Sequence, residues 1–186
     1  LTNRTEFLMN RGFINEDGLT ITEAGNVARL LQEVPGLLFG KLLVETNFLE
    51  TLSEVECAIL FSTINNVRVR EEFKRNNHYH IQKSVSAELC NTIDKLVSIN
   101  DDILSDATRR GIIPYEEELN YDIMEYIIDW VDVETEGECH GVINNMTSKS
   151  EIFLGEFIKT LIKINNICEE MKKVAEYFQR VDFLNK

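Results

Sequence analysis

The sequence predicts an all-α protein: a helical bundle with a long C-terminal helix and at most one short hairpin near the N-terminus. Only nine glycines and two prolines occur among the 186 residues, and so few helix breakers favour helices. Apolar residues recur at steps of three and four in several segments, which is the period of a helix with one buried face. Only Asp17-Gly18, between apolar flanks, is typical of a tight hairpin turn.

One short helix is expected before this turn and another directly after it. The first covers Thr2–Arg11 and stops at Gly12, because glycine commonly follows the last turn of a helix. The second begins at Thr22, a residue type that caps helices, and continues through "TEAGNVARLLQEV". These two helices open an N-terminal group that we assign to residues 1–65.

Two more helices complete this group. Pro35 restarts the chain as "PGLLFGKLLVETNFLETL", since proline suits the first turn of a helix. Ser53 and Glu56 have the spacing of a capping box, in which each side chain binds the backbone amide of the other residue, so a fourth helix follows over "CAILFSTI". Residues 66–83 have no sustained period and collect basic charge, which predicts an exposed connection.

The remaining segment, 84–186, is expected to contain three helices of one single domain that covers residues 1–186. A long helix spans about Ser84–Arg110 and ends at Gly111, with Pro114 and the acidic "YEEELN" behind it. Its core-type positions are Leu89, Ile93, Leu96, Val97, Ile103 and Leu104. "YDIMEYIIDWV" predicts a short apolar helix, and "DVETEGECHGVINNM" is interpreted as an acidic, glycine-containing approach to the last helix.

The last helix, about Ser150–Gln179, has the clearest period in the chain. Steps of three and four connect a predicted buried seam of Leu154, Phe157, Leu161, Ile164, Cys168, Met171, Ala175 and Phe178. At 100° per residue, roughly the opposite side carries Ile152, Gly155, Lys159, Lys163 and Asn166, flanked by Glu156 and Ile162. A glycine inside a helix costs about 1 kcal/mol relative to alanine, and the seam places this cost on the face that is not core.

Charge and composition exclude several classes of protein. The net charge of −13 argues against a domain that coats nucleic acid or anionic membrane through its overall field, so any nucleic-acid contact must be local. No apolar run approaches the ~20 residues that span a bilayer. The four cysteines are too scattered for a zinc ribbon or a disulfide framework, which favours reduced core thiols in an intracellular protein. Leu at position 1 predicts a fragment or processed product.

Three patterns were weighed as catalytic or metal sites. "GLLFGK" has the wrong spacing for a phosphate-binding loop and lies in an apolar helix. His78 and His80 could supply two metal ligands, but no further ligand stands near them, which favours a solvated loop. Cys139 next to His140 favours a structural cysteine beside an exposed histidine, because a nucleophile and its base are brought together by the fold. A hydrolase built on these residues is kept as the least favoured hypothesis.

Four stretches in order resemble one family. "FLMNRGFINEDGLTITEAGNVARLL" resembles the family's opening pattern of a helix, an L-G-F-I-like corner, a turn and an L-T-x-x-G-x-V-A helix. Gly12-Phe13-Ile14 match the corner, and Thr22, Gly25, Val27 and Ala28 match the second helix. "LLFGKLLVETNFLETLSEVECAILFSTI" resembles the apolar helix, L-S-x-E-E corner and A-x-L-L-S-C-F helix that follow. "IMEYIIDW" resembles L-M-E-V-V-Y-E-W, and "EIFLGEFIK" resembles D-V-F-E-G-S-I-I-R. The family is the C-terminal helical domain (DSHCT) of superkiller-type DExH-box RNA helicases.

The resemblance implies a role for the last helix. In the family the final motif opens a ratchet helix beside the RNA channel, and Lys159 stands where the family has an arginine that approaches RNA bases. Lysine keeps the charge but loses the planar stacking of arginine. The resemblance therefore implies nucleic-acid binding by Gly155, Lys159, Lys163 and Asn166. The family's acidic position after the fourth helix and its final helix have no counterpart here.

The resemblance also implies the context of the domain. No phosphate loop or DExH box occurs, so no cofactor is expected in this chain, and ATP and Mg belong to the core of the parent helicase. The implied partners are single-stranded RNA, the helicase core of the same polypeptide and the RNA exosome, in the nucleus or cytoplasm. The many Asn and Ile residues suggest an AT-rich genome, such as that of a large DNA virus or a protist. The alternative is a helical interaction or scaffold module without a nucleic-acid role.

Overall fold

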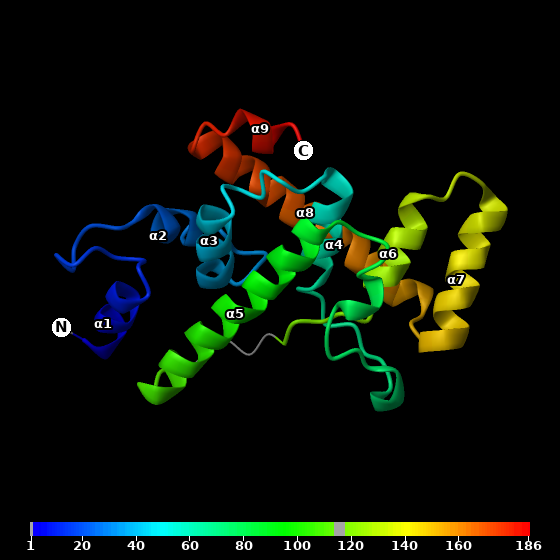
Figure 1. The fold of residues 1–186 in the computed structure, drawn as a ribbon, viewed down its shortest axis with the longest axis horizontal. Helices are drawn as coiled ribbons and strands as arrows, with labels where there is room; N and C mark the ends of the chain where they lie inside the picture. The colour runs from blue at the N-terminus through cyan, green and yellow to red at the C-terminus, as the bar shows by residue number, and fades with distance from the viewer. Residues whose placement is uncertain (1, 114–117) are drawn as a thin grey trace. The chain divides into compact units, whose positions relative to one another are not determined.

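Helices, without a β-strand, make up the regular structure of residues 2–113 and 118–186, the part of the chain that the computed structural model describes (Figure 1). In chain order the elements are α1 (Asn3–Asn10), α2 (Glu23–Ala28), α3 (Gly36–Glu45), α4 (Glu54–Ser62), the 3₁₀ helices η1 (Glu71–Phe73) and η2 (Tyr79–Ile81), α5 (Ala87–Arg109), α6 (Met124–Val131), α7 (Glu136–Ser150), α8 (Leu154–Tyr177) and α9 (Val181–Leu184). The all-α prediction is confirmed.

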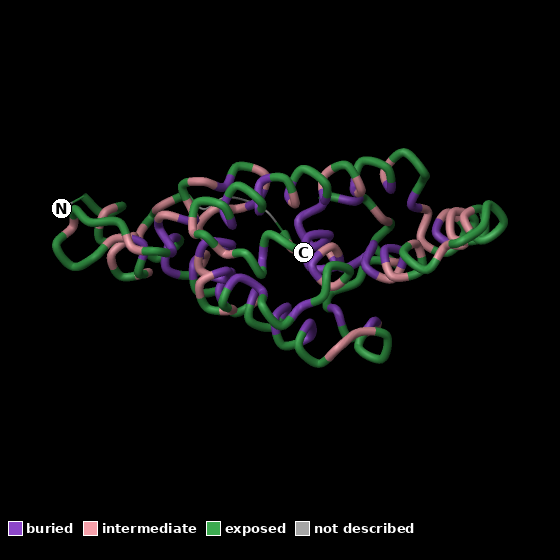
Figure 2. Tube along the Cα trace, turned by 90° about the horizontal axis from the view of Figure 1, so that it is seen from above, coloured by how far each residue is buried: buried purple, intermediate pink, exposed green. Residues whose placement is uncertain are grey.

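The chain divides into two compact units. Unit 1 comprises Leu1–Thr51, Asp94–Glu117 and Glu169–Lys186, and unit 2 comprises Leu52–Ile93 and Glu118–Cys168. Buried residues, coloured purple in Figure 2, occur in both units. The single domain over residues 1–186 stays a prediction.

The N-terminus of unit 1 follows the predicted local signals. The side chain of Thr2 caps α1, and Gly12 takes a left-handed conformation with φ +76° directly after the helix. The Asp17 carboxylate accepts hydrogen bonds from the amides of Leu19 and Thr20, both at 2.8 Å, and closes the turn. The predicted hairpin is confirmed only as a single antiparallel bridge, which joins Ile14 and Ile21.

The second helix is shorter than expected. We predicted it through Val34, but α2 ends at Ala28. The backbone amides of Gln32 and Glu33 instead donate hydrogen bonds to the buried Glu170 carboxylate, at 2.7 and 2.9 Å. A carboxylate that satisfies two amides makes a non-helical segment stable here, and the sequence pattern carries no sign of a partner so distant.

Helices α2 and α3 lie side by side at close distance (Figure 1). The approach depends on glycine, because a Cβ atom on Gly40 would lie 2.6 Å from the carbonyl oxygen of Ala24 and 2.9 Å from the Cβ of Ala28. Helix α3 starts directly after Pro35, as predicted. It ends at Glu45, whereas the segment assigned to this helix continued to Leu52.

The early end of α3 has a visible cause. Asn47, Phe48 and Leu49 all have left-handed backbone conformations, with φ values of 49°, 58° and 57°. Each costs roughly 1–2 kcal/mol for a residue other than glycine. The C-terminal residues compensate, since the Arg180 guanidinium lies 4.7 Å over the ring of Phe48 and the Lys186 ammonium donates to the carbonyl oxygen of Leu49 at 2.8 Å.

Unit 2 begins with the predicted capping box. Ser53 and Glu56 cap α4 reciprocally, and Glu56 also accepts a hydrogen bond of 3.1 Å from the amide of Ser86, just before α5. The connection 66–83 contains no α-helix and is mostly exposed, as predicted. The solvated loop proposed for its two histidines was wrong in part: His78 is buried and His80 is half-buried.

Helix α5 matches its prediction closely. It ends before Gly111, which has φ +65°. Leu89, Ile93, Leu96 and Ile103 are buried, whereas Val97 and Leu104 are half-buried. The predicted break at Pro114 lies outside the described residues.

Helix α7 corrects the sequence interpretation. "DVETEGECHGVINNM" is predicted as an acidic, glycine-containing approach to the last helix, but most of it forms α7, which lies beside α6 (Figure 1). Thr135 and Glu138 form a capping box at its start. Gly137 and Gly141 lowered the apparent helix propensity and hid this signal.

A buried carboxylate organises the end of α5 in unit 1. Asp106 accepts hydrogen bonds from the guanidinium groups of Arg11 at 3.0 Å, Arg109 at 2.7 Å and Arg110 at 3.0 Å. Burial alone would raise the pKa of Asp106, but these hydrogen bonds outweigh it and hold the pKa well below its usual value of 3.8. The carboxylate thus ties α1 to α5 as an anion.

The α2–α3 contact gives a first prediction. Gly40→Ala should lower the free energy of unfolding by about 2 kcal/mol, because backbone atoms cannot yield to an added methyl group. Urea unfolding measures the change. Gly141→Ala in α7 is the control: nothing lies within 4 Å of its added Cβ, so it should gain up to about 1 kcal/mol. Equal stability of Gly40→Ala and wild type would contradict the close packing.

A second prediction concerns Asp106. Asp106→Asn should lower stability at pH 7 by about 3 kcal/mol, because three guanidinium groups lose their anion. The lowered pKa means that the carboxylate stabilises the fold fully above its unfolded value of 3.8, and that this contribution fades as pH falls through the folded value.

The difference between wild type and variant, measured by urea unfolding across pH, should therefore shrink below about pH 4. Asp101→Asn, at an exposed position of the same helix, should leave stability within about 0.5 kcal/mol of wild type. A difference that does not change with pH would exclude Asp106 as the source.

Candidate nucleic-acid interface on α8

Helix α8 starts later than predicted. We expected the helix from Ser150, but Ser150 ends α7, Glu151 is left-handed with φ 54°, and α8 begins at Leu154. Ile152, predicted on the polar side, is fully buried in this corner. A salt bridge of 2.7 Å between Glu151 and Arg70 holds the corner from outside.

The first turns of α8 are fixed by an aromatic contact within unit 2. Phe157 is fully buried and meets the ring of Trp130 on α6 edge to face, with 5.2 Å between the ring centroids. Such a pair contributes roughly 0.5–1.5 kcal/mol beyond the area that it buries. The side of α8 opposite Phe157 is therefore held towards solvent.

The buried face of α8 differs from the predicted seam by about one residue. Its members are Phe157, Thr160, Ile164, Ile167, Glu170, Met171, Val174 and Ala175. Four of the predicted positions are among them, but Leu154 is 43% exposed, and Leu161, Cys168 and Phe178 are half-buried. Thr160 misled the pattern: its hydroxyl donates to the carbonyl oxygen of Glu156 at 3.1 Å, so a polar side chain can be buried without loss.

The four predicted site residues are mostly exposed. Gly155 and Asn166 are exposed, and no atom lies within 4 Å of a Cβ built on Gly155. The Lys159 side chain is 74% exposed and forms a salt bridge of 2.8 Å with Glu156. Lys163 is half-buried and thus less exposed than the other three. Whether these residues bind nucleic acid stays a prediction.

The structure adds apolar neighbours that the sequence interpretation missed. Phe153, Ile158 and Ile162 are exposed at 64%, 46% and 56%. At 100° per residue, Ile162 and Asn166 project about 20° to either side of Gly155. The face thus combines one cation, a glycine and branched apolar side chains. The signal lies in "EFIKTLIK", where the isoleucines fall outside the seam, but the sequence interpretation includes only Ile162, as a flank of the polar side.

The other candidate sites gain no support. In residues 2–113 and 118–186, no group of three or more His, Cys, Asp or Glu side chains could hold a metal ion. Cys139 and His140 both lie on α7, half-buried and exposed respectively. No described helix combines the length and the apolar character that a membrane crossing requires.

Comparison with known proteins identifies the family. The family model of the DSHCT (NUC185) domain matches residues 18–185. The chain belongs to the DSHCT family. It is thus a helicase-associated C-terminal domain, of the type found in superkiller-type DExH helicases. The match starts within the hairpin turn, so α1 of this DSHCT domain lies outside it. A search of curated proteins finds no match.

The open surroundings of Gly155 give a third prediction. In this DSHCT domain Gly155→Ala should raise the free energy of unfolding by about 0.5 kcal/mol, because alanine favours the helix and its methyl group meets no atom. Gly111→Ala has equally open surroundings but a left-handed backbone, so it should lose about 1 kcal/mol. Thermal unfolding of both variants gives the comparison, and a destabilised Gly155→Ala would reveal an unseen contact.

Proposed function

We propose that this DSHCT domain guides single-stranded RNA along the exposed face of the first half of α8, as part of an ATP-dependent RNA helicase. The observation that carries the proposal is the uncovered surface at Gly155, Lys159 and Asn166, in a chain that matches the family over residues 18–185. Each residue type on this face has a use in holding a strand.

Lys159 offers the positive charge that attracts a phosphate, and its exposed salt bridge to Glu156 costs little to exchange, since surface ion pairs contribute roughly 0–1 kcal/mol. Gly155 leaves room for a backbone to approach the helix. Ile158 and Ile162 are exposed and can make apolar contact with bases, and they have no hydrogen-bonding groups that would distinguish one base from another. Together these four residues support contact with an RNA strand of any base sequence.

The net negative charge of the chain fits weak, transient contact with RNA better than tight binding. With a net charge of −13 the domain repels a polyanion at long range, so contact on α8 must be short-lived and salt-sensitive. Weak contact permits a strand to move past the helix. The ATP-driven step, with its Mg ion, belongs to the helicase core of the same polypeptide, and the RNA exosome is the downstream partner that the family implies.

A second function is favoured by one observation. Phe153, just before α8, and Leu154, Ile158 and Ile162 on it are exposed apolar residues close together in the sequence, and such residues also suit a protein partner. On this alternative the domain is an interaction or scaffold module, and Lys159 has no part in RNA binding.

The fourth prediction separates the two functions. In the full-length protein that contains this domain, Lys159→Glu should slow RNA unwinding and weaken binding of a uridine oligonucleotide, because a phosphate contact becomes a repulsion. The slope of log affinity against log salt should fall by about 0.7, the value for one lost phosphate on a single strand. Gly155→Leu should fold normally and slow unwinding by filling the space beside the strand.

Matched controls exist on the same fold. Lys172 forms an equivalent salt bridge of 2.7 Å with Glu169 on the later half of α8, and Gly141 on α7 is as open as Gly155. Lys172→Glu and Gly141→Leu should leave binding and unwinding near wild type. Unwinding and a salt slope that Lys159→Glu and Gly155→Leu leave unchanged would refute RNA guiding and favour the scaffold.

A further inference from the structure

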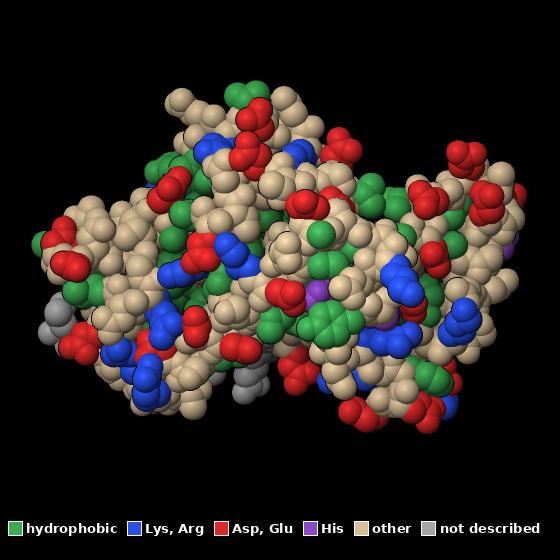
Figure 3. Space-filling model, viewed as in Figure 1, with side chains coloured by type: hydrophobic (Ala, Val, Ile, Leu, Met, Phe, Trp, Pro, Cys, Tyr) green, Lys and Arg blue, Asp and Glu red, His purple; other side chains and the backbone are tan. Residues whose placement is uncertain are grey.

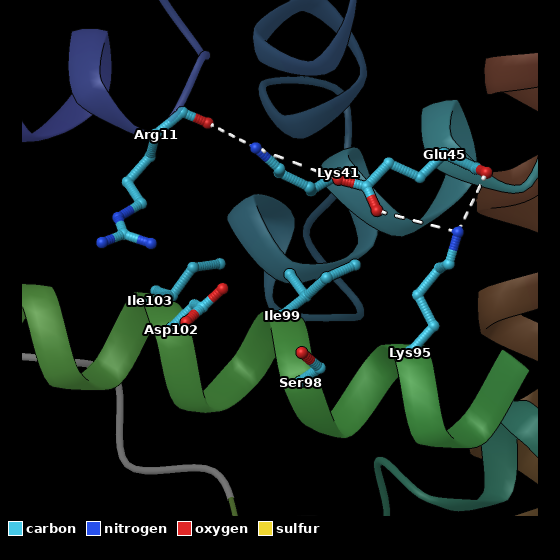
Figure 4. A pocket seen from close by; sticks show the side chains of 8 residues that line it. All are labelled: Arg11, Lys41, Glu45, Lys95, Ser98, Ile99, Asp102 and Ile103. Carbon is cyan, nitrogen blue, oxygen red and sulfur yellow. Dashed lines mark hydrogen bonds and ion pairs between the residues drawn. The ribbon is translucent and has the colours of Figure 1, made fainter. Parts of the chain in front are cut away.

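Unit 1 contains a pocket lined by cations that the proposed function does not use. It has a volume of about 280 Å³ and lies between α3 and the second half of α5. Arg11, Lys41 and Lys95 line it at the end of α1, on α3 and on α5, and Ile99 and Ile103 form its apolar side (Figure 4). None of these residues belongs to the α8 face.

The two lysines are positioned mainly by backbone carbonyl oxygens, which do not cancel their charge. The Lys41 ammonium donates to the carbonyl oxygen of Arg11 at 2.9 Å, and the Lys95 ammonium donates to the carbonyl oxygen of Glu45 at 3.4 Å. The Glu45 carboxylate lies 3.9 Å from each ammonium group, too far for a hydrogen bond. One carboxylate is thus shared between two lysines.

Arg11 differs from the lysines, because its guanidinium is paired with a carboxylate. Only its Nε atom is bonded to Asp106, at 3.0 Å, and that carboxylate also serves Arg109 and Arg110. Among the described residues, the hydrogen bond of the Arg11 guanidinium to a protein group is made by Nε and not by the two Nη groups. The guanidinium end lies at one end of the pocket and Lys95 at the other (Figure 4).

The counter-charges are few. Asp102 lines the pocket beside Ile103, and Glu6 lies 3.8 Å from Arg110. Figure 3 shows Lys and Arg side chains gathered over this part of unit 1, with Asp and Glu between them. The pocket lining itself, with three cations and two carboxylates, is net positive in a chain of net charge −13. A local positive potential of this kind attracts anions.

We propose that this pocket binds a phosphate group carried on a small organic moiety, such as the phosphate and sugar of a nucleotide. A guanidinium that presents its two Nη groups binds phosphate with two parallel hydrogen bonds, and the lysines add point charges. Ile99 and Ile103 give apolar contact to the carrier. A volume of about 280 Å³ is at the lower limit of small-molecule sites, which fits one nucleotide unit and no larger cofactor.

The test, and our fifth prediction, is a titration of the isotope-labelled 186-residue chain with uridine monophosphate, followed by the amide signals of α3 and α5. Binding should be in the millimolar range, and uridine without phosphate should bind at least tenfold more weakly. Lys41→Gln with Lys95→Gln should weaken binding at least tenfold. Asp102→Asn should tighten it several-fold, because it removes a repelling carboxylate. Lys173→Gln, an exposed change elsewhere in unit 1, should have no effect.

A hexauridylate arm distinguishes the two sources of the phosphate. A strand ligand predicts that the oligomer binds more tightly than the monophosphate at equal phosphate concentration, and a free nucleotide predicts the reverse. The same affinity for uridine and its monophosphate, or unchanged binding in the lysine double variant, would overturn the proposal. These readouts on α3 and α5 are independent of unwinding, so they stand or fall separately from RNA guiding on α8.

Discussion

The fold of unit 1 depends on how the backbone amides that follow α2 find partners. The helix stops at Ala28, and Glu170 accepts from the amides of Gln32 and Glu33, so a carboxylate from α8 completes a segment far away in the sequence. A buried anion with two amide donors has its charge satisfied without a cation. Because the segment before Pro35 is held in this way, α3 can return against α2 at the distance that Gly40 permits.

Positive charge is used in two distinct ways in this chain. Around Asp106 three arginines converge on one carboxylate, which leaves a net positive charge there. One of the three, Arg11, also lines the pocket. On α8 the single exposed lysine of the candidate face is paired with Glu156 in its own helix. Structure and charge are coupled in the first case, because α1 and α5 are joined through the same ions. In the second case the ion pair contributes little to stability and can be exchanged for a phosphate.

Signals between distant residues could not be read from the sequence, whereas several of those between residues three or four apart could; the capping box of Thr135 and Glu138 was missed. The capping box of Ser53 and Glu56 and the stop at Gly111 were predicted because their partners are neighbours. The left-handed turn at Phe48 could not be found, since Arg180 and the C-terminal residues stabilise it from more than a hundred positions away. On α8 the general face was predicted, but the buried Thr160 turned the true seam, because a hydroxyl bonded to its own helix counts as polar in a pattern and as apolar in a core.

The two candidate anion sites should differ in residence time for a physical reason. Lys159 is exposed on a flexible stem, and a strand that takes its ammonium group must displace Glu156 and then compete with water. The pocket cations are held by carbonyl oxygens and by Asp106, so little side-chain entropy is lost when they bind an anion. The mobile contact at Lys159 suits a strand that must keep moving, and the pre-organised cations of the pocket suit a phosphate group that stays bound. On the two proposals taken together, the same acidic chain lets a polyanion pass along one helix and holds a single phosphate near another.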